Sequence, residues 1–176
     1  LVHRLDRPVG GVVALARTSK AAARLSAQFA SRAAEKHYAA LACGAPAHEA
    51  RLSGYLVRDE QGGARMAGAD MPGAKPAALF YQRLTAKGGV TLLDVSLLTG
   101  RHHQIRCQLA GVGLPLWGDQ RYNPSAVPGE QLALWAYALT LEHPTTKARM
   151  TFVSRPRGKA WAPFEDELSA LIAGVR

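Results

Sequence analysis

The sequence predicts an α+β fold in which a mixed, mostly antiparallel sheet is flanked by helices. Apolar runs of strand length outnumber segments with helical periodicity, and several runs are separated by only a few residues. Connections that short cannot form parallel crossovers, so neighbouring strands are expected to pair antiparallel. The chain has 176 residues, 48% of them hydrophobic and 20% charged, which suits one domain spanning residues 1–176 with its own core.

In the N-terminal half, the local pattern explains each expected element. An apolar run at residues 12–16 follows a Pro/Gly turn, as a buried strand does. Thr18 and Ser19 are N-cap candidates for the alanine-rich helix that follows. Residues 37–43 form a second strand-like run. Residues 47–73 mix glycines with charges and predict either a hairpin or a long loop.

In the C-terminal half, turns and periodicity again define the elements. Residues 86–89, Ala-Lys-Gly-Gly, are a suitable hairpin connection between two strand-like runs. Ile105, Leu109 and Val112 recur at helical spacing and give one apolar face, and glycines end that helix. Over the whole chain we expect strands at 12–16, 37–43, 77–84, 90–98, 132–141 and 150–153, and helices near 19–32, 101–111 and 164–172.

The charge balance is strongly basic, with a net charge of +9 and a pI of about 10.1. Clustered Lys and Arg gain affinity for nucleic acid by releasing phosphate counterions, so a polyanionic partner is one interpretation. A scattered basic surface that only keeps the protein in solution would give the same totals. The charge alone does not decide between the two.

Composition also bears on the compartment. No apolar run approaches the roughly 20 residues that span a bilayer, and the first residues do not resemble a signal peptide. Cys43 and Cys107 are too few for a disulfide framework. We therefore expect a monomeric cytoplasmic protein with reduced thiols and no membrane partner.

Asp6 is the first candidate for chemistry, because it stands between Arg4 and Arg7 just before the Pro/Gly turn. Nearby positive charge favours the ionised carboxylate, which can act as a nucleophile or a base. A surface ion pair that caps the turn explains the same local pattern. Such pairs are common, so the local pattern alone favours the surface ion pair.

A second polar cluster, residues 100–106, joins an expected strand to an expected helix. Arg106 lies one helical turn beyond His102, so the two share a face. A metal site made of His102, His103 and Cys107 is disfavoured, because adjacent histidines on a helix point about 100° apart. No paired-cysteine or HExxH motif accompanies them. A solvated helix N-terminus is the simple alternative.

Tyr38 is the third candidate and lies in an expected strand among small residues. An isolated tyrosine in such a strand is more often part of the core. It can also line a pocket and stack its ring on a nucleic-acid base. Its own surroundings do not separate these two interpretations.

Together and in this order, the clusters resemble the RluA-type pseudouridine synthases, which modify RNA. The HRLD signature is matched at residues 3–6, and the resemblance covers nearly the whole chain. The further matches are K-x-Y-x-A at Lys36, Tyr38 and Ala40; G-R-x-H-Q-I-R at 100–106; G-x-P-x-x-G-D-x-x-Y at Gly113, Pro115, Gly118, Asp119 and Tyr122; and H-P-x-T with M-x-F at His143, Pro144, Thr146, Met150 and Phe152.

The resemblance implies the pseudouridine synthase catalytic fold and an isomerase that converts uridine to pseudouridine without cofactor or metal. By resemblance, Asp6 is the catalytic nucleophile, Tyr38 packs against the target base, and Arg106 pairs with the aspartate. We expect the partner to be ribosomal or transfer RNA, contacted by Arg4, Arg7, Arg101, His103 and Gln104.

The chain departs from the family pattern at three places. Val9-Gly10-Gly11 replaces a Thr-Ser-Gly turn, and Cys107-Gln108 replaces an apolar-His pair. Family members also carry strands and a K-P-x-G segment before HRLD, so we expect an N-terminal segment to be missing and a sheet edge to be left unpaired.

Two other functions fit parts of the pattern. A non-catalytic RNA-binding domain of the same fold would keep the basic surface but would not need Asp6, Tyr38 and Arg106 together. A hydrolase of sugar bonds usually needs two carboxylates. Asp119 is the only other acid in the matched motifs, and we interpret it as structural, in a Gly-Asp turn.

Overall fold

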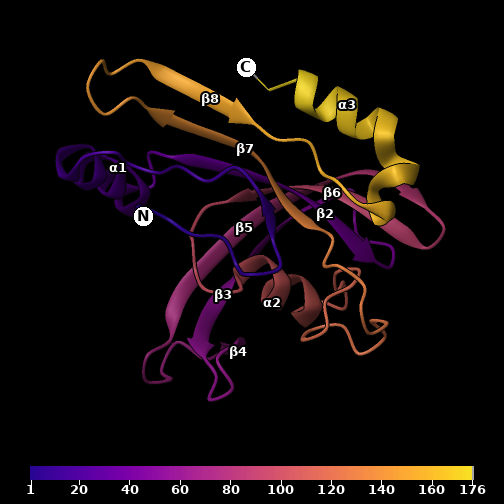
Figure 1. Ribbon diagram of the computed structural model, residues 1–176. Helices are drawn as coiled ribbons and strands as arrows, with labels where there is room; N and C mark the ends of the chain where they lie inside the picture. Colours follow the sequence, from indigo (N-terminus) through magenta and orange to yellow (C-terminus); the bar gives the residue numbers. More distant parts are fainter. Residues whose placement is uncertain (176) are drawn as a thin grey trace.

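A computed structural model describes residues 1–175 and shows an α+β fold, as the sequence predicts (Figure 1). Within these residues the sheet has eight strands in the order β1-β7-β2-β6-β5-β3-β4, with β8 also paired to β7. The only parallel pair among them joins β1 to β7. The strands are β1 Gly10–Gly11, β2 Glu35–Cys43, β3 Glu49–Arg58, β4 Ala64–Ala67, β5 Lys75–Lys87, β6 Val90–Leu97, β7 Leu134–Glu142 and β8 Arg149–Val153.

The first helix forms where its cap predicts it. The α1 helix, Ser19–Ser31, starts with the side chain of Thr18 accepting a hydrogen bond from the amide of Ala21. The C-terminal helix α3, Glu165–Ala173, follows a 3-10 turn, η1, at Lys159–Phe164. No helix within the described residues has the length and hydropathy needed to cross a membrane.

The expected strand at residues 12–16 is wrong, because strand pairing there is limited to Gly10 and Gly11. These two residues pair with Trp135 and Ala136 at the edge of β7, and the amide of Val12 donates to the carbonyl of Ala136. From Ala138 onward that edge is paired with β8. The segment 12–16 therefore has no free partner on β7, although its alternate side chains still pack against α1 and β7.

Residues 47–73 form a hairpin, which was one of the two expected alternatives. The strands β3 and β4 pair antiparallel from Tyr55–Ala67 to Arg58–Ala64. Elsewhere the boundaries differ from the expected ones by a few residues. The strand β5 is longer than expected at both ends, and α2, Gln104–Gly111, begins after residue 103 rather than at 101 because His103 has a left-handed φ of 50°.

The sheet separates two layers of apolar contacts, and neighbouring residues of β2 belong to different layers. Tyr38 packs with Ile105 and Leu109 of α2, whereas Ala39 packs with the cluster that contains Trp161 and Leu168 of η1 and α3. Alternate strand residues point to opposite faces, so this arrangement follows from the strand period. Tyr38 is thereby placed on the face that carries α2.

Gly118 lies in the loop before β7, at a point where two segments of that loop approach closely. Its φ is 69°, and a Cβ added there would collide with the carbonyl oxygen of Gln131. Gly129 has a similar φ of 88° but open space around it. We expect Gly129→Ala to cost only the left-handed strain of about 1–2 kcal/mol. We expect Gly118→Ala to cost roughly 1–3 kcal/mol more, as overpacking does.

Urea unfolding of both variants measures this difference. Equal midpoints for Gly118→Ala and Gly129→Ala would contradict the close approach of the two loop segments.

Candidate active site

Asp6 lies in the N-terminal loop, at the edge of a pocket of about 520 Å³. The chain turns directly after it, because the amide of Val9 donates to the carbonyl oxygen of Asp6 at 2.9 Å. The flanking Arg4 and Arg7 are exposed and form no ion pair within residues 1–175. Asp6 instead pairs with Arg106 and lies close to His103, both on the other side of the pocket.

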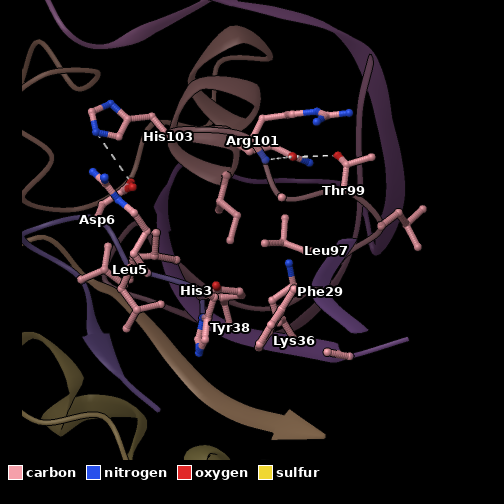
Figure 2. A pocket seen from close by; sticks show the side chains of 18 of the residues that line it. His3, Leu5, Asp6, Phe29, Lys36, Tyr38, Leu97, Thr99, Arg101 and His103 are labelled. Carbon is pink, nitrogen blue, oxygen red and sulfur yellow. Dashed lines mark hydrogen bonds and ion pairs between the residues drawn. The ribbon is translucent and has the colours of Figure 1, made fainter. Parts of the chain in front are cut away.

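The pocket brings the three expected catalytic residues together. Asp6 comes from the N-terminal loop, Tyr38 from β2 and Arg106 from α2, and all three line the cavity. Figure 2 shows Asp6 facing His103, with Tyr38 and Lys36 on β2 across the pocket. A volume of this size is typical of small-ligand sites and can hold a nucleotide.

Arg106 lies between two carboxylates. Its Nε and Nη2 donate to the two oxygens of Asp119 at 2.8 and 2.7 Å. Its Nη1 lies 3.6 Å from Oδ2 of Asp6. Burial acts to lower the pKa of Arg106, but the hydrogen bonds and charge of Asp119, helped by Asp6, outweigh it and raise that pKa. The guanidinium therefore stays charged inside the protein.

Asp119 is the fixed end of this arrangement, because its residue is fully buried. Besides Arg106, its Oδ1 accepts hydrogen bonds from the amides of Arg121 and Tyr122 at 3.1 and 3.2 Å. Its expected place in a Gly-Asp turn agrees with these contacts. Its bidentate contact with Arg106 was not expected, since nothing in the sequence indicates which basic side chain an aspartate in a turn will contact.

Tyr122 connects Arg106 to the β3–β4 hairpin. Its ring lies under the guanidinium, 5.1 Å from Cζ of Arg106. Its hydroxyl accepts from the amide of Ala64 at 2.8 Å and donates to the carbonyl of the same residue at 3.0 Å. The same hydroxyl lies 2.9 Å from Nδ1 of His103. The matched motif contained Tyr122, but its spacing gave no indication of these contacts.

His103 is the residue most affected by its surroundings. Burial lowers its pKa to about 4; the charge of Asp6 acts in the opposite direction, and the charges of Arg106, His102 and Arg121 lower the pKa further. The imidazole is therefore neutral at pH 7. Its Nε2 lies 3.8 Å from Oδ2 of Asp6, as the dashed line in Figure 2 indicates.

Asp6, His102 and His103 form the one group within residues 1–175 whose ligand atoms all lie within 4.8 Å of one another. The two histidines do not point 100° apart, as they would on a helix, because both precede α2 and their rings stack at 3.9 Å. However, His102 Nε2 already bonds the carbonyl of Gly62, and Arg106 places a positive charge beside Asp6. Absence of a metal remains a prediction.

Tyr38 presents a phenol at the pocket floor. The residue is buried, and burial together with the negative charge of Asp6 raises the pKa of Tyr38 far above its ordinary value. The ring therefore keeps its proton throughout the physiological range. An aromatic side chain beside a reactive carboxylate can hold a flat base against it.

The expected RNA contacts fall into two groups. Arg4 and Arg7 are exposed, and Arg101 and His103 line the pocket. Gln104 also lines the pocket, but it is buried, and its side chain bonds the hydroxyl of Thr99, the amide of Arg101 and the carbonyl of Ala78. These bonds brace the loop before α2, and a contact between Gln104 and RNA stays a prediction.

Lys36 and His3 also line the pocket, although neither was among the expected site residues. Lys36 lies two residues before Tyr38 on β2, so both side chains point to the same face of the strand. Burial lowers the pKa of Lys36. The ring of His3 stacks on Phe29 at 4.3 Å and accepts a hydrogen bond from the amide of Ala14. The K-x-Y spacing was the available signal for Lys36.

This geometry defines a class of protein: a basic α+β domain that can hold a nucleotide-sized group against a carboxylate. Comparison with known proteins gives the family. The model of the RNA pseudouridylate synthase family matches residues 1–111. The chain therefore belongs to the RNA pseudouridylate synthase family, and its relatives include the RluA-type enzymes that the motifs resemble.

Similar proteins share either sequence or fold with this chain. An "Uncharacterized RNA pseudouridine synthase" of Chloroflexus aurantiacus is 38% identical over 146 residues, covering 82% of this chain and 46% of that protein. "Ribosomal large subunit pseudouridine synthase D" of Nitrosomonas europaea is 32% identical, covering 100% of this chain and 51% of that protein. This chain thus spans about half the length of these relatives. "Human RNA Pseudouridylate Synthase Domain Containing 1" has the same fold, with a TM-score of 0.77 at 22% identity over 99% of this chain and 80% of that one.

The buried pair of Arg106 and Asp119 makes a stability prediction. Asp119→Asn removes the negative charge and leaves a buried guanidinium without its partner, which we expect to cost about 3–5 kcal/mol of unfolding free energy. Glu142→Gln is the matched control, because it breaks an ion pair with Lys147 on the exposed surface. Exposed pairs contribute little. Denaturant unfolding of both variants checks the contrast, and comparable small losses would refute it.

Proposed function

We propose that this chain is the catalytic domain of an RNA pseudouridine synthase that isomerises selected uridines, with Asp6 as nucleophile. The observation that carries the proposal is the meeting of Asp6, Tyr38 and Arg106 in one pocket, although they come from segments far apart in sequence. The reaction breaks the bond between N1 and C1′ and forms a bond between C5 and C1′. One proton leaves C5 and one is gained at N1, so no oxidant, metal or cofactor is needed.

Each residue has a physical role in this proposal. The guanidinium of Arg106 orients Asp6 and stabilises its negative charge from 3.6 Å away. Tyr38 offers an aromatic surface to a base that has left its stack, which offsets part of the lost stacking energy. Arg4, Arg7, Arg101 and His103 contact the RNA. Ribosomal RNA of the large subunit is the favoured substrate, because several relatives are named ribosomal large subunit pseudouridine synthases.

The alternative functions fit the site less well. A domain that only binds RNA gains nothing from Asp6, since a carboxylate in a phosphate-binding pocket repels the ligand. A hydrolase of sugar bonds needs a second carboxyl group that can reach the substrate. Asp119 cannot serve, because it is fully buried and bound to Arg106 through both oxygens.

Removal of Asp6 tests the proposal. We expect Asp6→Ala to form no pseudouridine on an unmodified transcript of large-subunit ribosomal RNA, because the nucleophile is absent. RNA affinity should be kept or slightly increased, because a negative charge is lost. Asp70→Ala is the control, since Asp70 is an exposed loop residue outside the pocket. Pseudouridine-specific chemical mapping gives the readout. Undiminished product from Asp6→Ala would overturn the role of Asp6, and no product from the unaltered protein would overturn the function.

The basic surface makes a separate prediction. RNA affinity should fall steeply with salt, and Arg7→Gln should reduce the slope of log Kd against log salt by about 0.7–0.9, the value for one phosphate contact. Arg155→Gln should leave the slope unchanged, because Arg155 pairs with Glu165 beside α3, away from the pocket. Filter binding at several salt concentrations measures both slopes. A flat salt dependence of the unaltered protein would contradict an RNA-facing basic surface.

A further inference from the structure

Two hydrogen-bond acceptors face each other at the mouth of the active site. Oδ2 of Asp6 and Nε2 of His103 lie 3.8 Å apart, and both side chains are mostly shielded, at 20% and 12% exposure. The positive group nearest Asp6 is Arg106, which approaches Oδ2 separately at 3.6 Å. The gap between the carboxylate and the imidazole therefore suits a group that donates a hydrogen bond.

We assign the proton of His103 to Nδ1 from the hydrogen bonds of Tyr122. The hydroxyl of Tyr122 has one proton, which it donates to the carbonyl oxygen of Ala64. It accepts a hydrogen bond from the amide of Ala64, and with its own proton on the carbonyl, its remaining lone pair accepts from Nδ1 of His103. A neutral imidazole with its proton on Nδ1 has a lone pair on Nε2, directed toward the pocket.

The imidazole is neutral under working conditions, because its pKa is lowered to about 4. His103 is also held in place from several sides. Its left-handed backbone conformation ends the preceding turn, its ring stacks on His102 at 3.9 Å, and Tyr122 meets the ring edge-on. Tyr122 is thus a positioning residue that sets both the direction and the tautomer of His103.

The chemistry of the target nucleotide limits which donor can enter this gap. Asp6 must lie beside the bond between N1 and C1′ in order to act on it. In a uridine within an RNA chain, O3′ and O5′ are esterified and N3–H lies across the base ring. The donor adjacent to C1′ is the 2′-hydroxyl on C2′. This group is also the one that distinguishes RNA from DNA.

We infer that Nε2 of His103 accepts a hydrogen bond from the ribose 2′-hydroxyl of the target nucleotide, so that the pocket selects ribonucleotides over deoxyribonucleotides. This inference rests on the proposed function and specifies how its site recognises the substrate. It assigns His103 to the sugar of the target nucleotide, rather than to the phosphates that a basic surface attracts.

A thermodynamic cycle on product-like RNA tests the assignment. The probe is a short RNA that spans the mapped site and carries pseudouridine there, and its partner carries 2′-deoxypseudouridine at the same position. Neither probe is converted further, so equilibrium affinities can be measured with the unaltered protein. We expect the deoxy probe to bind roughly three- to tenfold more weakly, as the loss of one neutral hydrogen bond predicts.

The variants are chosen to keep the backbone intact. Asn tolerates the left-handed conformation of residue 103, but its side chain is too short to reach the gap. We expect His103→Asn to bind both probes within twofold of each other. His103→Gln is longer and keeps an acceptor oxygen, so it should restore part of the discrimination. Tyr122→Phe should weaken it, because Nδ1 loses its partner.

Several outcomes would overturn the inference. One is an unaltered protein that binds both probes equally, and another is a His103→Asn variant that keeps the full penalty for the deoxy probe. Failure of the proposed function would show itself separately, as absence of pseudouridine in the mapping reaction, and the inference would fall with it. Failure of the inference alone would leave an active enzyme whose sugar discrimination does not depend on residue 103.

Discussion

The contact between Arg106 and Asp119 is the interaction on which the rest of the site depends. Removing both charges from water carries a large penalty, which is offset only when the geometry is good and the remaining hydrogen-bonding groups are satisfied. Here both oxygens of Asp119 accept from the guanidinium, and one of them also accepts two backbone amides. Arg106 is therefore held on two of its nitrogens, which leaves Nη1 directed at Asp6.

Contacts around this pair connect the active site to a distant part of the chain. The ring of Tyr122 packs under Arg106, and its hydroxyl forms hydrogen bonds with Ala64 and His103. Next to it, Arg121 donates to the carbonyl of Gln61, and His102 bonds the carbonyl of Gly62. The turn of the β3–β4 hairpin, residues 59–63, thus supports the loop that precedes α2. These contacts give the β3–β4 hairpin, whose sequence mixes glycines and charges, a structural role in supporting the loop before α2.

The sheet supplies the opposite wall of the site. The strand β2 is central, with β6 and β7 on its two sides, so Tyr38 and Lys36 project from a rigid element. Asp6, by contrast, lies on a loop that is anchored behind the site by β1 on the edge of β7. The pocket therefore combines a fixed aromatic floor with a carboxylate whose position is set by side chains from α2 and the loops around it. Functional residues often lie on loops that a rigid scaffold positions in this way.

What the sequence determined by itself is what depends on neighbours in the chain. The cap at Thr18, a hairpin turn within residues 86–89 and the alternation of Tyr38 and Ala39 follow from local hydrogen bonds and from periodicity, and the ordered motifs indicated the family. Tertiary structure alone decided that residues 12–16 form no strand pair, because β8 pairs with the adjacent part of the β7 edge. It also decided that Arg106 meets Asp119 as well as Asp6, that Gln104 is internal and that His103 faces Asp6. Each of these depends on which distant groups fold against a residue, and neither spacing nor composition contains that information.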